Sequence, residues 1–226
     1  DWRFWGILDN ASKMFDATGK EFKHTAAFIP SFRATTEKLA STGPAGVKLV
    51  KATARYMENV LHARERGKKL ALITYNFSPA VLFAFDIVPY CLEGLSAFYA
   101  STWNKGIYES LDYCCEVGFT ETSCSGQRVG LGAVLAGLAE RPDFIVCSTP
   151  GVCDSNANAF AFAGAYLDVP FCQLNYPPTL IDERAVEYHR ADFKNMLTFL
   201  EEHTGNKPDL DRMREVCREI VRQDEI

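Results

Sequence analysis

Four short apolar runs, separated by segments of helical length, constrain the fold of this chain more than any other feature. The runs KLALITY, VPYCLEG, DFIVCST and VPFCQLNY occupy residues 69–75, 88–94, 143–149 and 169–176. Each has the length of a buried strand, and strands that alternate with helices form parallel βαβ units. We therefore predict an α/β fold with a three-layer, doubly wound and mostly parallel sheet of the Rossmann or flavodoxin-like type.

Helical patterns fill the segments around these runs. A helix is expected from about residue 45 to 66, with Pro44 in its first turn and Gly67 at its end. Its apolar stripe consists of Val47, Val50, Ala54, Met57 and Leu61.

Further helices follow the apolar runs. SPAVLFAFDI should form one that is capped by Ser78. Another should begin between Asp154 and Asn156, and two more should cover roughly 182–203 and 209–224, with the break at GNKPD.

Three segments are expected along the chain. Residues 1–43 are rich in aromatic side chains without a regular period, and we interpret them as an N-terminal extension with helical content. Residues 44–180 should form the α/β domain. Residues 181–226 should form a helical segment that leads to a C-terminal half not contained in this sequence.

Charge and hydropathy exclude some classes of function. The 24 Lys and Arg residues against 29 Asp and Glu give a net charge of -5, which argues against nucleic-acid binding. No apolar run reaches the roughly 18–20 residues that span a bilayer, so we expect no membrane segment. The basic cluster HARERGKK, at 62–69, is expected to be structural, at a helix end.

The chain has eight cysteines and no spacing typical of a disulfide scaffold. Reduced thiols in the cytoplasm are therefore expected, some of which bind a ligand. Ligands of parallel sheets sit beyond the carboxyl ends of the strands. Cys153 lies at such an end, whereas Cys147 lies inside a strand and is expected to be a buried packing residue.

Two cysteines immediately precede predicted helices. Cys153 comes before DSN, and Cys124 comes before the small-residue helix SGQRVGLGAVLAG. A helix N-terminus stabilises an anionic thiolate or metal–sulfur cluster. The spacing of 29 residues is too long for a zinc-binding CxxC pair. Both sulfurs can converge on one rim of the sheet, which is the sequence-based hypothesis for a site.

Other chemistries find less support. The four histidines are scattered, and none falls on a predicted strand end. The motifs GxSxG and GxxxxGK[ST] are absent, and Gly126, Gly130 and Gly132 of GQRVGLG are expected to serve close helix packing. Cys114-Cys115 is interpreted as helix packing, and Cys91, Cys172 and Cys217 as core or surface thiols.

Several motifs together carry a resemblance. GKKLALITYNFSPAVLFAFDIVPYCLEG, SCSGQRVGLGAVLAG, PDFIVCSTPGVCDSNANAF and VPFCQLNYPP, in this order, resemble the N-terminal half of the 2-hydroxyacyl-CoA dehydratase/benzoyl-CoA reductase family. The resemblance covers roughly residues 44–226, and TPGVCDS with the upstream Cys124 is its most specific part.

The resemblance implies an oxygen-sensitive iron–sulfur cluster held by three cysteines, a 4Fe–4S cluster or, as an alternative, a double cubane. Cys124 and Cys153 match the first two ligand positions, and the third is expected beyond residue 226. The resemblance also implies an acyl-CoA substrate, a related subunit in a heterodimer or homodimer, and an ATP-dependent iron–sulfur activator protein that supplies one electron.

One departure from the family pattern bears on the chemistry. Members have an acidic residue in a Pro-x-Glu-Leu pattern, where this sequence has Ser78-Pro79-Ala80-Val81. The loss of this carboxylate leaves fewer groups that can handle a proton. The missing carboxylate argues against a strict 2-hydroxyacyl-CoA dehydratase and favours a reductase-type or accessory subunit.

The sequence thus predicts an iron–sulfur subunit of an acyl-CoA-processing enzyme that uses one-electron radical chemistry, a 2-hydroxyacyl-CoA dehydratase (a lyase) or a benzoyl-CoA reductase-like oxidoreductase. The residues expected to line its cleft are Asn76, Ser78, Ser155 and Gln173. One alternative is a non-catalytic partner subunit that shapes the CoA cleft without its own cluster. Another is a Rossmann-like small-ligand binder with incidental cysteines.

Overall fold

The computed structural model describes residues 34, 37–39, 41–102, 104–149, 153–176 and 182–224. Most of the predicted extension 1–43 lies outside them, with its aromatic residues Trp2, Phe4, Trp5, Phe15, Phe22, Phe28 and Phe32. The described chain divides into two compact units. The first combines residues up to His62 with Leu92–Arg141, and the second combines Ala63–Cys91 with Pro142–Ile226. The predicted boundaries at 43 and 180 stay predictions.

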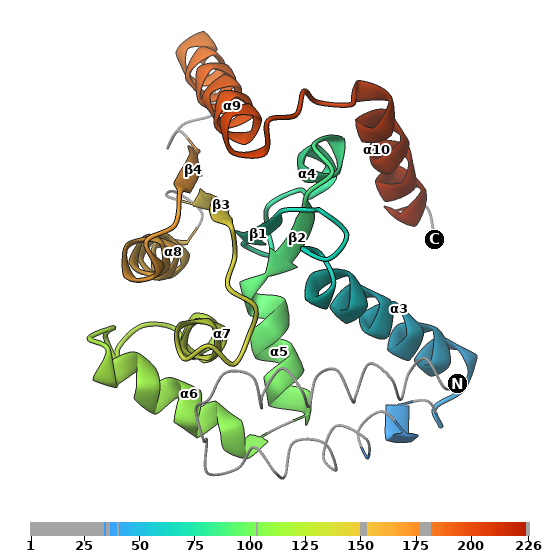
Figure 1. The fold of residues 1–226 in the computed structure, drawn as a ribbon, viewed down its shortest axis with the longest axis vertical. Coiled ribbons are helices and arrows are strands. Elements are labelled where there is room, and N and C mark those ends of the chain that lie inside the picture. Colours follow the sequence, from blue (N-terminus) through green and yellow to red (C-terminus); the bar gives the residue numbers. More distant parts are fainter. Residues whose placement is uncertain are drawn as a thin grey trace. The chain divides into compact units, whose positions relative to one another are not determined.

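The second unit contains the sheet that the apolar runs predict. Its strands are β1 (Leu70–Ile73), β2 (Val88–Cys91), β3 (Phe144–Thr149) and β4 (Phe171–Asn175). They are all parallel, in the order β2-β1-β3-β4 (Figure 1). The four predicted strands are therefore confirmed, and the order is the flavodoxin-like one, in which the direction of winding reverses between β1 and β3.

Pairing fixes the register of the central strands. Leu72 of β1 is aligned with Tyr90 of β2 on one side and with Ile145 of β3 on the other. All four β1 residues are buried, as expected for an inner strand of a parallel sheet. At the amino ends, the Leu70 N–H donates to Asp143 Oδ2 at 2.8 Å, so a side chain extends the pairing of these strands.

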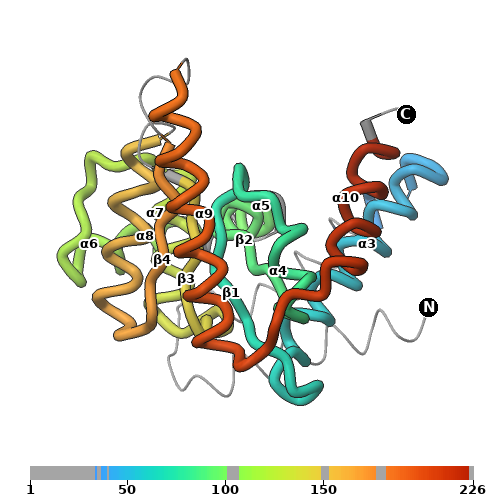
Figure 2. The backbone as a smooth tube through the Cα atoms, turned by 90° about the horizontal axis from the view of Figure 1, so that it is seen from above, coloured from blue at the N-terminus to red at the C-terminus, as the bar shows by residue number. Residues whose placement is uncertain are grey.

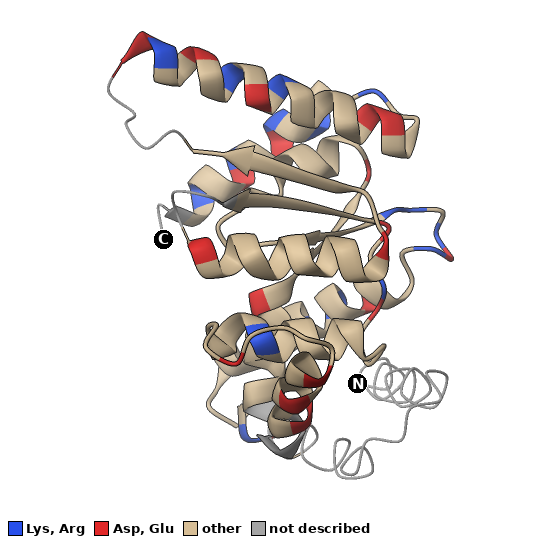
Figure 3. Cartoon of the chain, turned by 90° about the vertical axis from the view of Figure 1, so that its left-hand side faces the viewer, with Lys and Arg blue, Asp and Glu red and all other residues tan. Residues whose placement is uncertain are grey.

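Helices cover the sheet and make the outer layers. These are α4 (Ala80–Ala84), α8 (Asp154–Leu167), α9 (Glu183–Thr204) and α10 (Leu210–Asp224). The helix α8 packs on β3, and α9 lies along β4 (Figures 1 and 2). The blue and red segments of α9 in Figure 3 show that charged residues recur along most of this helix, whereas the sequence of α8 carries only Asp154 at its start. The three-layer α/β fold is thus confirmed.

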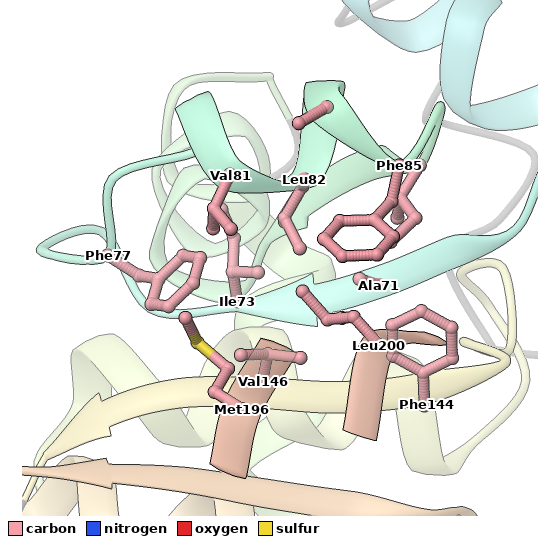
Figure 4. Close-up of a cluster of buried hydrophobic side chains, with 12 residues drawn as sticks. Ala71, Ile73, Phe77, Val81, Leu82, Phe85, Phe144, Val146, Met196 and Leu200 are labelled. Carbon is pink, nitrogen blue, oxygen red and sulfur yellow. The ribbon is translucent and has the colours of Figure 1, made fainter. Parts of the chain in front are cut away.

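The core of the second unit lies between the sheet and helices α4 and α9. Figure 4 shows Ile73 of β1, Val146 of β3 and Leu82 of α4 turned toward Met196 and Leu200 of α9. A ring contact adds to it, because Phe144 meets Phe199 edge-on with 5.8 Å between centroids. This apolar layer fixes the strands whose ends carry the candidate site.

The first unit is helical in the part that is described. It contains α3 (Pro44–Leu61), α5 (Leu92–Thr102), α6 (Asn104–Glu116) and α7 (Ser125–Leu135). Gly130 and Gly132 permit close packing, since a Cβ would lie 2.5 Å from Leu92 O at the first and 2.0 Å from Ser110 O at the second. The predicted packing role of these two glycines is confirmed.

Two local predictions about helix ends are wrong. The helix α3 begins at Pro44 as expected but ends at Leu61, and residues 62–67 form turns in which Gly67 has φ +71°. Pro79, not Ser78, precedes α4, with no side-chain cap. The helix has only five residues, and its chain turns away at Asp86, which has φ 56°.

The basic cluster 62–69 consequently does not sit in the last turn of a helix, which contains no basic residue. Its basic side chains instead form ion pairs with acidic residues that lie just before β2 and β3. Arg64 and Lys69 lie 3.8 Å and 3.9 Å from the carboxylate of Asp143, and Lys68 pairs with Asp86. The structural role expected for this cluster holds, although its place differs.

We predict that Leu200→Ala lowers the free energy of unfolding by about 2–5 kcal/mol, because Leu200 is fully buried in the core of the second unit and its removal leaves a cavity. Urea denaturation measures the loss. Leu210→Ala is the matched control, since Leu210 is 54% exposed and should change stability by less than about 0.5 kcal/mol. Equal losses in both variants would contradict the assigned core.

Candidate functional site

The candidate site of the second unit lies at the carboxyl edge of the sheet. Parallel strands bring the residues after β1, β3 and β4 to one edge, and ligands of such folds bind where the winding reverses, here between β1 and β3. Of the residues predicted from the sequence, Asn76 follows β1, and Ser155 lies in the first turn of α8, after β3. Gln173 is the central residue of β4, which continues to Asn175, so its predicted place at the strand end is wrong.

Asn76 joins the two central strand ends. Its Nδ2 donates to the carbonyl oxygen of Ser148 at 3.1 Å, and its Oδ1 accepts from the hydroxyl of the fully buried Thr74. Both ends of the amide are therefore used inside the protein, which makes Asn76 a brace of the rim. Ser78 follows it as an exposed residue.

The helix α8 begins at this edge, immediately after Cys153. Cys153 is the N-cap residue, in extended conformation, and its carbonyl accepts the Ala157 N–H at 3.1 Å. The residue is half-buried, as is Ser155 in the first turn. The prediction that α8 begins directly after Cys153 is confirmed. Cys147, fully buried inside β3, is the packing residue that the sequence predicts.

The end of β4 carries a polar cluster that sequence analysis missed. Gln173 is half-buried in β4, and two residues later the Asn175 N–H and Nδ2 donate to Asp192 Oδ2 of α9 at 2.6 Å and 3.3 Å. His189 Nδ1 lies 3.4 Å from Asn175 O, and its ring stacks on Tyr176 with 5.3 Å between centroids.

His189 does not fall on a strand end in the sequence, as expected, yet it lies beside the end of β4 in the structure. It belongs to α9, so the sequence places it far from β4, and the helix returns it to the end of that strand. The spacing of His189 and Asp192, three residues apart on one helix face, is the signal that could have found this cluster.

The other predicted cysteine, Cys124, belongs to the first unit. It is the N-cap residue of α7 and is exposed, and its carbonyl accepts the backbone N–H groups of Gln127 and Arg128 at 3.1 Å. Its Sγ lies 3.5 Å from where a Cβ on Gly126 would stand, so the sulfur lies over the first turn of the helix. The sequence-based expectation of a packing role for Gly126 is wrong. Among the described residues, the only atom within 4 Å of such a Cβ is this sulfur, so no neighbouring helix packs closely against Gly126.

Arg128 ties the loop of Cys124 to α6. One guanidinium nitrogen donates to Glu121 O at 3.0 Å, and the other donates to Leu111 O at 3.1 Å and lies 3.0 Å from Cys115 Sγ. Glu121 is in the loop, three residues before Cys124. The arginine thus fixes both ends of the segment that presents the thiol, a role with no signal in the sequence.

The adjacent cysteines of α6 face different surroundings. Cys114 is fully buried and its thiol donates to Arg128 O at 3.1 Å, which confirms the expected packing role. Cys115 is exposed. Burial, opposed in part by the charge of Arg128, raises the pKa of Cys114 from 9.0 to about 11. Burial and the charge of Asp192 also raise the pKa of Cys172 to about 11.

None of the eight cysteines forms a disulfide, so each sulfur keeps the chemistry of a thiol. Within the described residues, no three His, Cys, Asp or Glu side chains gather in an arrangement that could hold a metal ion. Cys124 and Cys153 share one feature with the chemistry of cluster ligands, since each caps a helix of eleven or more residues at its electropositive end.

In the part of the chain that the structure describes, every helix is too short or too polar to cross a membrane. Fold and edge residues together define a flavodoxin-like α/β protein with a polar site at the reversal of winding.

Comparison with known proteins identifies the family. The family model described as 2-hydroxyglutaryl-CoA dehydratase, D-component, matches residues 74–226, which is more than half of the chain. The chain belongs to this family. It is also similar to the alpha subunit of (R)-phenyllactyl-CoA dehydratase from Clostridium sporogenes, with 25% identity over 166 residues, covering 70% of this chain and 40% of the relative. The chain spans less than half the length of that relative.

We predict that Arg128→Met lowers the free energy of unfolding by about 1.5–3 kcal/mol, since it removes one charged hydrogen bond to the part-buried Leu111 carbonyl and one to the exposed Glu121 carbonyl. It should also speed the reaction of Cys115 and Cys124 with a thiol reagent, measured by mass spectrometry. Arg55→Met, at an exposed position of α3, is the control. Unchanged labelling in Arg128→Met would show that the arginine does not hold the loop.

Stability should fall as the pH rises from about 9 to about 11. In this range the folded protein keeps protons on Cys114 and Cys172 that the unfolded chain has lost, because burial raises both pKa values. The stabilising effect is complete below pH 9. Tyr99, whose pKa is also raised by burial, adds a fall of the same sign above pH 10.

Urea denaturation across this pH range tests the assignment. Cys114→Ala should flatten the fall relative to the parent protein, whereas Cys217→Ala, at an exposed position, should reproduce the parent curve. An identical slope in the parent and in Cys114→Ala would contradict the raised pKa of the Cys114 thiol.

Proposed function

We propose that this chain is part of an iron–sulfur subunit of an acyl-CoA-processing enzyme of the 2-hydroxyacyl-CoA dehydratase type. The observation that carries the proposal is that, in a member of this family, the two cysteines of the family motifs both cap helices. Cys124 and Cys153 are proposed as ligands of one cluster, a 4Fe–4S cluster or a double cubane. A third ligand is proposed outside residues 1–226.

The local geometry suits anionic sulfur at both positions. Each thiol stands at the end of a helix where backbone N–H groups have no intrahelical partner, so the charge of a thiolate is stabilised there. The loop of the Cys124 thiol is further held by Arg128, which donates to Glu121 O. When bound, an iron–sulfur cluster with an open iron supplies a Lewis acid and a one-electron donor at the same position.

The remaining predicted residues are proposed to serve the acyl-CoA. Ser78 and Ser155 have hydroxyl groups that can bind a thioester or phosphate oxygen, and Gln173 has a half-buried amide in the middle of β4. Asn76 is proposed to keep the ends of β1 and β3 together, since both ends of its amide are occupied. These residues bind and orient the substrate in the proposal, and none is assigned a proton transfer.

A second candidate function is favoured by the start of α4. Its first turn contains no acidic residue, and Ala80 and Val81 are buried there. The carboxylate that the family pattern places in this region is therefore not available to handle a proton. A benzoyl-CoA reductase-type subunit, or a non-catalytic partner subunit that shapes the CoA cleft, would need it less than a dehydratase does.

The assembly follows the same proposal. We propose a related subunit as partner, in a heterodimer or a homodimer, and an ATP-dependent iron–sulfur activator protein as electron donor, in the cytoplasm. The relative in Clostridium sporogenes is named as an alpha subunit.

Anaerobic purification with the chains that accompany the protein tests the ligands. We expect Cys124→Ala and Cys153→Ala each to lose most of the iron, the acid-labile sulfide and the EPR signal, because each removes a ligand. Cys217→Ala removes an exposed thiol of α10 and should keep the parent content. A full complement of iron and sulfide in both ligand variants would refute the assignment.

A further inference from the structure

His189 uses one of its ring nitrogens inside the protein and leaves the other available. Its Nδ1 lies 3.4 Å from the carbonyl oxygen of Asn175. A carbonyl oxygen only accepts hydrogen bonds, so Nδ1 carries the proton of the neutral ring, and Nε2 then has a lone pair. Among the described residues, Nε2 has no hydrogen-bond partner. The imidazole can therefore accept a proton at Nε2.

Neighbouring groups hold the imidazole in this orientation. Its ring stacks on Tyr176, with 5.3 Å between the centroids and 23° between the planes. Asp192 Oδ2 accepts the Asn175 N–H at 2.6 Å and Asn175 Nδ2 at 3.3 Å, which fixes the residue whose carbonyl oxygen faces His189. A group that transfers protons needs such support, because the same nitrogen must face the reacting atom in every turnover.

The cluster lies at the edge of the sheet where ligands bind. Asn175 is the last residue of β4, and it is aligned with Thr149, the last residue of β3. Neighbouring strands are about 4.8 Å apart, and β3 borders the reversal of winding. His189 is therefore held beside the carboxyl edge, one strand away from the reversal.

The second histidine of α9 lies in different surroundings. His203 is in the last turn, where its ring centroid is 4.3 Å from that of Phe199 and 6.2 Å from that of Phe144. Phe144 is the first residue of β3. His203 thus lies toward the amino edge of the sheet, among aromatic rings, and is a natural comparison for His189.

The proposed reaction requires a proton acceptor. Loss of water from a 2-hydroxyacyl thioester breaks the C2–O bond and a C3–H bond, so a proton must leave carbon and join the departing hydroxide. None of the residues proposed above to bind the substrate performs this transfer, and the first turn of α4 contains no acidic residue. Imidazole is the side chain that most often transfers protons in enzymes.

We propose that His189 Nε2 accepts the C3 proton of the acyl-CoA and gives it to the hydroxide that leaves C2. The C2–C3 double bond forms, the proton and the hydroxide leave as one water molecule, and the neutral imidazole is regenerated without net transfer of electrons. Asn175 and Asp192 are positioning residues for this step. The inference rests on the proposed function.

Protection from chemical modification tests whether the substrate reaches His189. Diethyl pyrocarbonate acylates neutral imidazole, and mass spectrometry follows the rate at each histidine in the anaerobically purified complex. The probe is butyryl-CoA, which has no 2-hydroxyl group and cannot be dehydrated. Saturating butyryl-CoA should slow the modification of His189 severalfold and leave that of His203 unchanged. An unchanged rate at His189 would overturn the inference.

His189→Phe tests the proton transfer, because phenylalanine keeps a ring beside Tyr176 and removes both nitrogens. With 2-hydroxybutyryl-CoA, which differs from the first probe by its hydroxyl group alone, kcat should fall about 10²–10⁴-fold. KM and the iron and sulfide content should stay close to those of the parent. Glu187→Gln, at an exposed position of the same helix, is the matched control and should keep the parent kcat.

The two proposals fail in different ways. A parent kcat in His189→Phe with full iron and sulfide would overturn this inference and leave the proposed function standing. Failure of the parent complex to bind iron and sulfide would overturn the proposed function, and this inference with it.

Discussion

The parallel pairing of β1 with β3 is the constraint on which the candidate site depends. Because both strands are apolar and buried, their register is fixed by burial, and Ala71, Leu72 and Ile73 are aligned with consecutive residues of β3. Parallel strands end at one edge, so the segments after them must begin there, and α8 starts within this edge region. The hydrogen bond from Asn76 Nδ2 to Ser148 O joins the ends of β1 and β3 at this edge. The backbone therefore brings the residues that follow β1 and β3 to one edge of the sheet, whatever their side chains are.

The two cysteines that carry the proposed function occupy equivalent local positions in separate units. Cys124 and Cys153 each cap a helix, and each helix presents backbone donors toward its cap. What surrounds each thiol differs. Arg128 holds the loop that contains Cys124, whereas Asn156, whose buried amide has no partner among the described residues, lies in the first turn of the helix that follows Cys153. The proposed function thus requires ligands from both units, and the family membership is the reason to propose that they act together.

The sequence predicted those elements that one physical pattern specifies. The apolar runs predicted the four strands, and Cys153 before DSN and Cys124 before SGQ predicted the starts of α8 and α7. These features depend on residues that are close together in the sequence. It did not predict the end of α3 or the cap of α4, where turn geometry at Gly67 and Asp86 decides. It also missed Arg128 and His189, since their partners are brought to them by packing of α6 and β4, which no local pattern encodes.

The central claim is that the thiols of Cys124 and Cys153 bind one inorganic group, and a trivalent arsenical tests it most directly. Phenylarsine oxide condenses with two thiols, releases water and leaves one arsenic bound to both sulfurs. Under anaerobic conditions, with iron removed, the account predicts that mass spectrometry finds a single arsenic joining the peptides of Cys124 and Cys153. Arsenic bound to other cysteine pairs, with Cys124 and Cys153 unlinked, would contradict it.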